Sequence, residues 1–304
     1  MPQPHSTALS LSDLQAVLNS LGALRQGRAL GLLLGTMCLT GLFMASVEPA
    51  LAAERNVPAL LWLAAAALSL LVGVNATGWL LMQEMLGKAR DLDGFDAVQA
   101  ALRQTHRTLA VLLFALAPLL PFMALLLIGL WAAQMPWVGA PLLAVFAPLS
   151  VLLAAFLALV LLVLVGPLAG PAIWSGAGVR DTARWLRRQA RERLIEATLL
   201  KLALLGLVTG VTGVLTLAVL TGARVLAVAT WLVDLPVPPK QVVAHLFGYT
   251  LKALGASGAP VVANSQAMAL SIGGGILLAL LVVLPTLVYL RGCCAIYLRL
   301  HGRA

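Results

Sequence analysis

The sequence predicts an all-α, polytopic integral membrane protein, and three observations support that fold class. Hydrophobic residues make up 61% of the 304 positions and charged residues only 10%, whereas a soluble domain carries about 25% charged residues. The apolar residues form six long stretches, and lysine and arginine gather in alternate connections between them. No soluble fold of this length can bury so much apolar surface, so lipid must be part of the solvent.

Each stretch is long enough to cross a bilayer as a helix, because a hydrocarbon core of about 30 Å needs roughly 20 apolar residues. The first stretch ends at Ala52-Ala53-Glu54, like a signal-peptide cleavage site, but 28 residues precede it, so we expect a retained helix. Residues 225–233 either prolong the fifth helix or lie in the interface. Prolines in three of the stretches predict kinks. The predicted spans are residues 29–52, 59–82, 109–132, 141–165, 197–221 and 266–290.

The positive charges predict how these spans are oriented. Fifteen lysines and arginines fall in the N-terminal segment, the second and fourth connections and the C-terminal tail, whereas four fall on the other side. Because cytoplasmic connections carry the excess of positive charge, we predict a multi-pass protein of a bacterial inner membrane with both termini in the cytoplasm. Lys201, just inside the fifth span, is expected to extend towards the arginine-rich side. The net charge of +9 is explained by the excess of lysine and arginine in the cytoplasmic connections. It therefore gives no reason to expect a nucleic-acid partner.

A short motif recurs three times in front of a pair of spans. Leu14-Gln-Ala-Val17, Phe95-Asp-Ala-Val98 and Val179-Arg-Asp-Thr182 are each followed by a leucine seven residues after the motif begins, and then by arginines. The pattern fits an amphipathic cytoplasmic helix leading into a transmembrane hairpin, repeated in one orientation. It fits chance matches among alanine and leucine equally well. The repeat units would be residues 12–82, 93–165 and 177–292 of one transmembrane domain, 1–304.

The only sizeable external segment predicted from the sequence is residues 234–265. Its run KQVVAHLFGYTLKALG places apolar residues on one helical face, which predicts an interfacial helix on the outer leaflet. The same segment could equally cap an opening between helices or bind an envelope partner.

The helix-then-hairpin layout and the ending LPTLVYLRGCCAIYLRL, residues 284–300, resemble uncharacterised bacterial six-span membrane families. These include the membrane domain fused to some glycerophosphodiester phosphodiesterases. The resemblance covers most of the chain through layout, and it implies an integral membrane protein without an obvious active site. The sequence contains no phosphodiesterase domain, so that activity is not implied.

The densest positive charge lies in RDTARWLRRQARERLIEATLLK, residues 180–201. On a helix, five of its arginines fall at i, i+4, i+7, i+8 and i+11 and stack along one face. Val179, Leu186 and Leu194 lie on the more apolar side, which we expect to rest on the cytoplasmic membrane surface. Arginine pairs well with lipid phosphates. The alternatives are an orientation signal alone, or a docking surface for an acidic cytoplasmic partner or an anionic substrate. The candidate residues are Arg180, Arg184, Arg187, Arg188 and Arg191.

Polar residues are scarce inside the predicted spans. Asn75 lies within the second span, where it makes either an interhelical hydrogen bond or part of a transport path. Glycines at GxxxG spacing, in residues 31–35 and 206–210, predict close helix approach. Three adjacent glycines in the sixth span either pack against a neighbour or open a path; they are Gly273, Gly274 and Gly275.

The sequence shows no arrangement typical of catalysis or metal binding. The four histidines and three cysteines are scattered without ligand spacing. Asp91, Asp93 and Asp96 in DLDGFD could hold Mg²⁺, but a solvated turn before a helix is the simpler interpretation. We therefore predict that the protein is not an enzyme and has no metal ion or cofactor.

Together these patterns favour a non-enzymatic membrane subunit or scaffold that binds lipids, chiefly anionic head groups, and partner proteins. The partner would be a membrane protein, a cytoplasmic protein or a second copy of the chain. The alternative is a transporter or lipid-handling protein with a path between helices near Asn75 and the three glycines.

Overall fold

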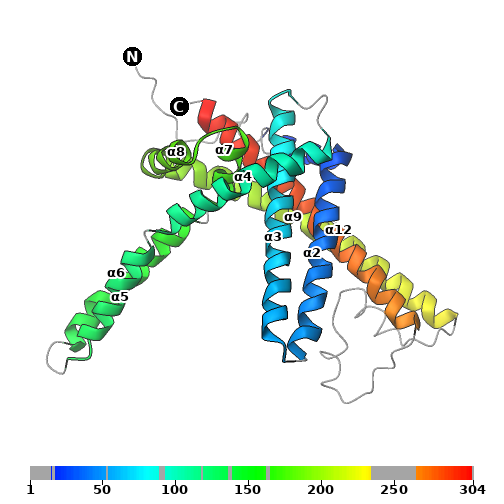
Figure 1. Cartoon of the computed structure of the whole chain (residues 1–304), viewed down its shortest axis with the longest axis horizontal. Helices are drawn as coiled ribbons and strands as arrows, with labels where there is room; N and C mark the ends of the chain where they lie inside the picture. The colour runs from blue at the N-terminus through cyan, green and yellow to red at the C-terminus, as the bar shows by residue number, and fades with distance from the viewer. Residues whose placement is uncertain are drawn as a thin grey trace. The chain divides into compact units, whose positions relative to one another are not determined.

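The structure is a computed structural model, and it describes residues 15, 18–52, 54–88, 93–117, 119–135, 139–161, 165–233 and 265–302. Almost every residue in these ranges is helical and none lies in a strand (Figure 1). A helix satisfies its own backbone N–H and C=O groups, which an apolar chain in lipid requires. The all-α prediction is therefore confirmed for the described residues.

The described elements are one 3-10 helix and a series of α-helices of very different lengths. In chain order they are η1 (Asn19–Arg25), α2 (Gly27–Ala52), α3 (Asn56–Met85), α4 (Gly94–Leu116), α5 (Leu119–Ala132), α6 (Gly139–Val160), α7 (Gly166–Trp174), α8 (Val179–Glu192), α9 (Leu194–Leu232) and α12 (Ser265–Gly302).

Six helical segments are long and apolar enough to cross a membrane. Each overlaps one of the six predicted spans, so the hydropathy prediction is confirmed. Their surfaces expose large apolar side chains, such as Leu120 at 75% and Val225 at 69%, which indicates lipid contact because soluble monomers rarely expose large apolar surfaces. The segments are Gly27–Val47, Asn56–Met85, Gly94–Ala132, Leu142–Val160, Leu194–Thr230 and Leu277–Gly302.

Several helices extend further than the sequence predicted. α9 runs without a break to Leu232, so the apolar residues after 221 prolong the fifth span instead of forming an interfacial segment. α4 begins at Gly94, which means that the amphipathic segment and the start of the third span form one helix. α6 and α12 continue through Pro148 and Pro285.

The chain forms two compact units, and each combines segments that are distant in the sequence. Unit 1 comprises Met1–Leu21, Leu71–Leu204 and Leu290–Ala304, and unit 2 comprises Gly22–Leu70 and Leu205–Tyr289. The helices α3, α9 and α12 each contribute one part to unit 1 and another part to unit 2.

The core of unit 1 forms around α7. α4 packs against α7 and α8, which also contact each other, and α5 pairs with α6 (Figure 1). Residues 167–174 of α7 are all buried. Pro167 occupies the first turn of α7, where a missing N–H costs nothing. This helix was not predicted from the sequence, because the fourth span was expected to end at residue 165.

In unit 2, α2 lies along the N-terminal part of α3. The hydroxyl groups of Thr40 and Ser69 are hydrogen bonded at 2.9 Å. The rings of Phe43 and Trp62 stack with centroids 5.9 Å apart. These contacts join the two helices into a hairpin.

Some predictions fall on residues that the structure does not describe. The predicted external helix in residues 234–265 lies outside the described residues except for Ser265, which begins α12. Most of the first predicted repeat helix and Asp91 also lie outside them. The threefold repeat and its boundaries stay predictions.

Candidate functional site

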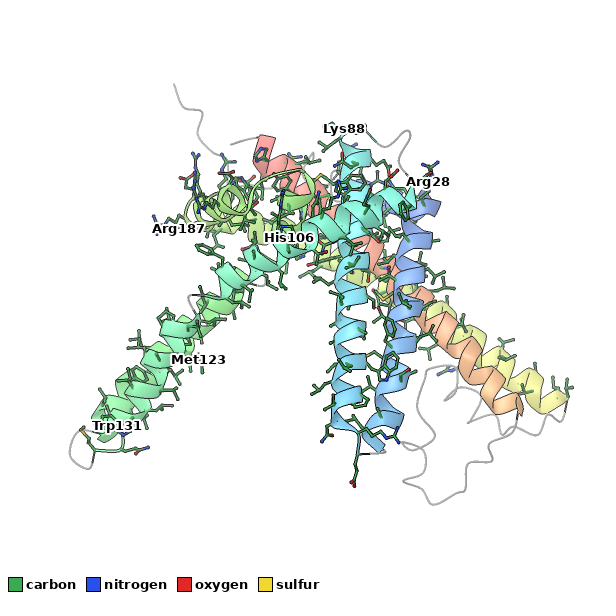
Figure 2. All side chains as sticks on the ribbon, in the orientation of Figure 1. Arg28, Lys88, His106, Met123, Trp131 and Arg187 are labelled. Carbon is green, nitrogen blue, oxygen red and sulfur yellow. The ribbon has the colours of Figure 1, made fainter. Side chains whose placement is uncertain are left out.

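The arginine face of α8 consists of five side chains that are all exposed. α8 extends from Val179 to Glu192, so the predicted helical spacing does place these residues along one side. Figure 2 shows Arg187 among the charged side chains of α8, and Met123 and Trp131 on the α5–α6 pair. The residues of the arginine face are Arg180, Arg184, Arg187, Arg188 and Arg191.

Two acidic residues on α8 offset part of this charge. A guanidinium nitrogen of Arg184 lies 3.7 Å from a carboxylate oxygen of Asp181, and Arg188 Nε lies 3.0 Å from Glu192 Oε2. All four side chains are more than half exposed, and exposed pairs of this kind contribute little to stability. Three positive charges remain in excess on the helix face, which is therefore suited to anions.

The opposite face of α8 packs against protein. Thr182, Leu186 and Gln189 are buried there, and α8 contacts α4 and α7. The prediction that Leu186 faces the membrane surface is wrong, because Leu186 is covered by protein and is only 6% exposed. This packing fixes the direction in which the arginine face points.

Asn75 of α3 lies at the centre of a polar network in unit 1. Its Oδ1 accepts hydrogen bonds from Trp174 Nε1 of α7, at 2.9 Å, and from Thr108 Oγ1 of α4, at 3.1 Å. Its Nδ2 donates to the carbonyl oxygen of Leu71 at 2.8 Å. Asn75 is 2% exposed. Of the two alternatives predicted for Asn75, an interhelical hydrogen bond or part of a transport path, the structure shows the first.

Trp174 is held on α3 at three points. Its indole N–H binds Asn75, and its carbonyl oxygen accepts a hydrogen bond from Gln83 Nε2 at 3.3 Å. Its ring lies against Gly78, where an added Cβ would overlap the indole. Since Asn75 and Gly78 are three residues apart, they lie on the same face of α3. The face of α3 is thus shaped to receive this one side chain.

The network continues from α7 to the C-terminal part of α12. The hydroxyl groups of Ser175 and Tyr297 are hydrogen bonded at 3.0 Å. The Tyr297 ring contacts Trp185 of α8 edge to face, with centroids 5.1 Å apart, and stacks on His301 at 5.3 Å. α8 is thereby anchored to α12 through aromatic contacts.

Two charged side chains of the spans contact partners on α12. Lys201 is 5% exposed and its Nζ lies 3.7 Å from Cys293 Sγ. The expectation that Lys201 extends to the membrane surface is therefore wrong, because its ammonium group is enclosed by protein. Glu84, at the end of α3, pairs with Arg291 at 3.7 Å.

The predicted glycine contacts differ from the observed ones. A Cβ at Gly31, Gly35, Gly206 or Gly210 would meet no described atom within 4 Å, so within the described part of the chain these GxxxG pairs make no close helix contact. Gly292 of α12 does allow a close approach to α9, since a Cβ there would overlap the Leu204 side chain.

The three adjacent glycines of the sixth span belong to unit 2, whereas Asn75 belongs to unit 1. Gly273 is partly exposed and a Cβ there would meet no described atom within 4 Å. Gly274 is buried. Gly275 lies in α12, and its surroundings are outside the described residues.

Asp93 and Asp96 of DLDGFD take part in a helix cap. The backbone N–H of Asp93 donates to Asp96 Oδ2 at 3.2 Å, directly before α4. This is one half of a capping box, which satisfies an amide at a helix start. In the described part of the chain, no group of three or more histidine, cysteine or acidic residues is placed to share a metal ion.

The helices and these sites define the class of protein: the chain is an all-α, multi-pass membrane protein. Comparison with protein-family models, curated proteins and solved structures found no match.

Proposed function

We propose that this protein is a non-enzymatic membrane subunit or scaffold whose arginine face holds anionic lipid head groups at the membrane surface. The observation that carries the proposal is the contrast between the two faces of α8. One side is buried against α4 and α7, and the other presents five exposed arginines. A face fixed in this way binds phosphate groups without first having to order the helix.

The distribution of positive charge supports the finer localisation within this proposal. Fifteen lysines and arginines on one predicted side against four on the other favour a bacterial inner membrane protein with both termini in the cytoplasm. The arginine face would then meet the anionic cytoplasmic leaflet, where each basic residue contributes about 1 kcal/mol.

The hydrogen bonds of Asn75 support a scaffold over a transport path. Its amide oxygen accepts from two neighbouring helices and its nitrogen donates to the backbone. A solute path needs polar groups that face a cavity, and the amide of Asn75 is committed to the protein.

Lipid titration of the full-length protein tests the arginine face. Native mass spectrometry in a mild detergent would compare phosphatidylglycerol with phosphatidylcholine for the wild type and for the triple variant Arg184→Gln, Arg187→Gln, Arg188→Gln. We expect the wild type to prefer phosphatidylglycerol. The triple variant should lose on the order of 100-fold of that preference, since three charges of about 1 kcal/mol each are removed.

Two control variants locate the effect. The triple substitution by lysine keeps the charge but loses paired hydrogen bonding, so its preference should be intermediate. Arg224→Gln removes an exposed arginine of α9 and should change nothing. A Gln variant that still prefers phosphatidylglycerol at low salt would contradict the proposal.

The partner half of the proposal needs a separate measurement. The mass of the complex released from the same detergent should exceed that of one chain by a defined protein subunit, either a second copy or another protein. If the chain is released only as a monomer with bound lipid, the lipid-binding role remains supported and the scaffold role is contradicted.

A further inference from the structure

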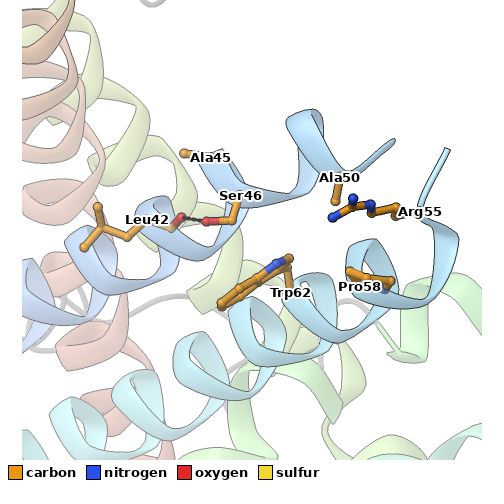
Figure 3. Close-up of a pocket in the computed structure, with 7 residues that line it drawn as sticks. All are labelled: Leu42, Ala45, Ser46, Ala50, Arg55, Pro58 and Trp62. Atoms are coloured by element: carbon orange, nitrogen blue, oxygen red, sulfur yellow. Dashed lines mark hydrogen bonds between the residues drawn. The ribbon is translucent and has the colours of Figure 1, made fainter. Parts of the chain in front are cut away.

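A groove of about 490 Å³ opens at the end of the α2–α3 hairpin in unit 2 (Figure 3). Its volume falls in the range of small-molecule sites, about 300–1,000 Å³. It is separate from the arginine face, which belongs to unit 1. The lining residues are Leu42, Ala45, Ser46 and Ala50 of α2, Arg55 of the turn, and Pro58 and Trp62 of α3.

The turn places one cation at the end of the groove. The N–H of Arg55 donates to the carbonyl oxygen of Ala50 at 2.9 Å, and its own carbonyl accepts from Ala59 at 3.2 Å. Glu54 adopts a positive φ of 57°, which is uncommon for a residue other than glycine. Arg55 is exposed, and among the described residues that line the groove it alone is charged.

The start of α3 adds to this positive character. Arg55 immediately precedes Asn56, the first residue of α3, and Pro58 in the first turn lines the groove. The first N–H groups of a helix lack intrahelical partners, and the helix dipole is positive there. A negatively charged group next to Arg55 would therefore be favoured by the guanidinium group and by the N-terminal end of α3.

The walls leading away from Arg55 are apolar. Leu42 is 67% exposed and Trp62 is 40% exposed, and the Trp62 ring is held by stacking on Phe43. The Ser46 hydroxyl donates to the carbonyl oxygen of Leu42 at 3.1 Å (Figure 3). Its hydrogen is thus directed to its own helix. The groove combines a cationic end with a wall suited to hydrocarbon.

We propose that this groove binds one glycerophospholipid molecule from the surrounding bilayer. The phosphate lies against Arg55 and the first turn of α3, and an acyl chain lies along Leu42 and Trp62. Both helices are membrane spans, so phospholipid surrounds the site at high concentration, and guanidinium groups recognise phosphate well. The groove shares no residue with the arginine face, so the proposal does not depend on the proposed function.

Photocrosslinking of the full-length protein in nanodiscs tests the site. The probe is phosphatidylcholine with a diazirine on its acyl chain, because its zero net charge limits attraction to the arginine face. Its partner probe is diacylglycerol with the same chain, which lacks the phosphate. The label in residues 42–62 is measured by peptide mass spectrometry relative to the label in α5, whose large apolar side chains are exposed.

We expect phosphatidylcholine to be enriched in residues 42–62 by about tenfold over diacylglycerol, the ratio expected from a charge-assisted hydrogen bond. Arg55→Gln should remove the enrichment. Ala45→Trp, which fills the groove and leaves the charge in place, should also remove it. The matched control Arg224→Gln takes an exposed arginine from elsewhere in unit 2 and should leave the enrichment intact.

Three results would overturn the assignment. Equal enrichment of diacylglycerol would mean that the phosphate is not recognised. Full labelling of Arg55→Gln would exclude the guanidinium. Displacement of the probe by inorganic phosphate at low salt would identify a site for free anions and not for phospholipid. Thermal unfolding of each variant shows whether the hairpin is folded, and Ala45→Trp tests the site independently if Arg55→Gln does not fold.

Discussion

At the scale of single residues, Asn75 and Trp174 form the most specific contact in unit 1. The amide oxygen of Asn75 takes the indole N–H, and the hydroxyl of Thr108 binds the same oxygen. Both Asn75 and Trp174 are buried. A buried polar group that loses its partner costs about 1–3 kcal/mol, which exceeds the net gain from a typical hydrogen bond.

We expect Asn75→Leu to lower the free energy of unfolding by about 1–3 kcal/mol, because the indole N–H of Trp174 is left unpaired. Trp174→Phe removes the donor while Thr108 still binds Asn75, so its cost in hydrogen bonding should be smaller. Unfolding by denaturing detergent, followed by circular dichroism, measures both. The double variant should show a coupling of about 0.5–1.5 kcal/mol.

Thr221→Val is the matched control for this cycle. Its hydroxyl is exposed and bonds only the carbonyls of its own helix, so the expected change is within about 0.5 kcal/mol. Additive effects of the Asn75 and Trp174 substitutions would show that the hydrogen bond does not couple them.

At the scale of elements, the contact between α3 and α7 depends on the absence of a side chain at Gly78. The Trp174 ring occupies the space that a Cβ would fill. α7 in turn contacts α4 and α8. A change at Gly78 therefore acts on the support of the arginine face as well as on α3.

Gly78→Ala should destabilise the protein by about 1–3 kcal/mol, the usual cost of overpacking. Gly210→Ala is the comparison, because a Cβ there meets no described atom within 4 Å. It should be neutral or should stabilise the helix by up to about 1 kcal/mol. Thermal unfolding in one detergent compares the pair, and equal effects would show that the Trp174 contact is not tight.

The two elements of this core differ in how far the sequence predicts them. The arginine face of α8 follows from helical spacing alone, since every residue needed is local. α7 was not predicted, because GPLAGPAIW continues the apolar run of the preceding span and no polar residue separates the two. Pro167, which begins the new helix, lies beyond the predicted end of the fourth span and was not among the prolines expected to form kinks.

The partners within unit 1 could not be predicted for a different reason. Asn75 and Trp174 are 99 positions apart, and which face of α3 meets α7 is set by packing. Gly78 and Gly292 stand outside any GxxxG pair, so spacing gave no signal for them. Lys201 looked free to extend along its helix, and its contact with Cys293 depends on how α9 and α12 pack.

At the scale of the whole molecule, the orientation in the membrane rests on the asymmetry of positive charge. Exposed arginines lie on α8, whereas the tip of the α5–α6 pair bears Gln134 and Met135 without a lysine or arginine. The positive-inside rule places these two regions on opposite sides.

Cysteine labelling checks this orientation. In a Cys38→Ser background, which removes the exposed native thiol and leaves the buried Cys293 and Cys294, a membrane-impermeant maleimide should label Gln134→Cys in intact cells. Arg187→Cys should react only after permeabilisation. Labelling of Arg187→Cys in intact cells would reverse the orientation and remove the cytoplasmic assignment of the arginine face.

The length of α9 has a consequence for the choice of membrane. Its candidate membrane span of 37 residues, Leu194–Thr230, which includes Glu196, Lys201 and Arg224, measures about 55 Å at 1.5 Å per residue. The hydrocarbon region is about 30 Å thick, and transmembrane helices rarely tilt beyond about 40°. Tilt alone cannot absorb this hydrophobic mismatch, so some turns of α9 must emerge among the head groups. Thicker bilayers would draw those turns inward, which makes acyl-chain length a variable that the stability of this protein should follow.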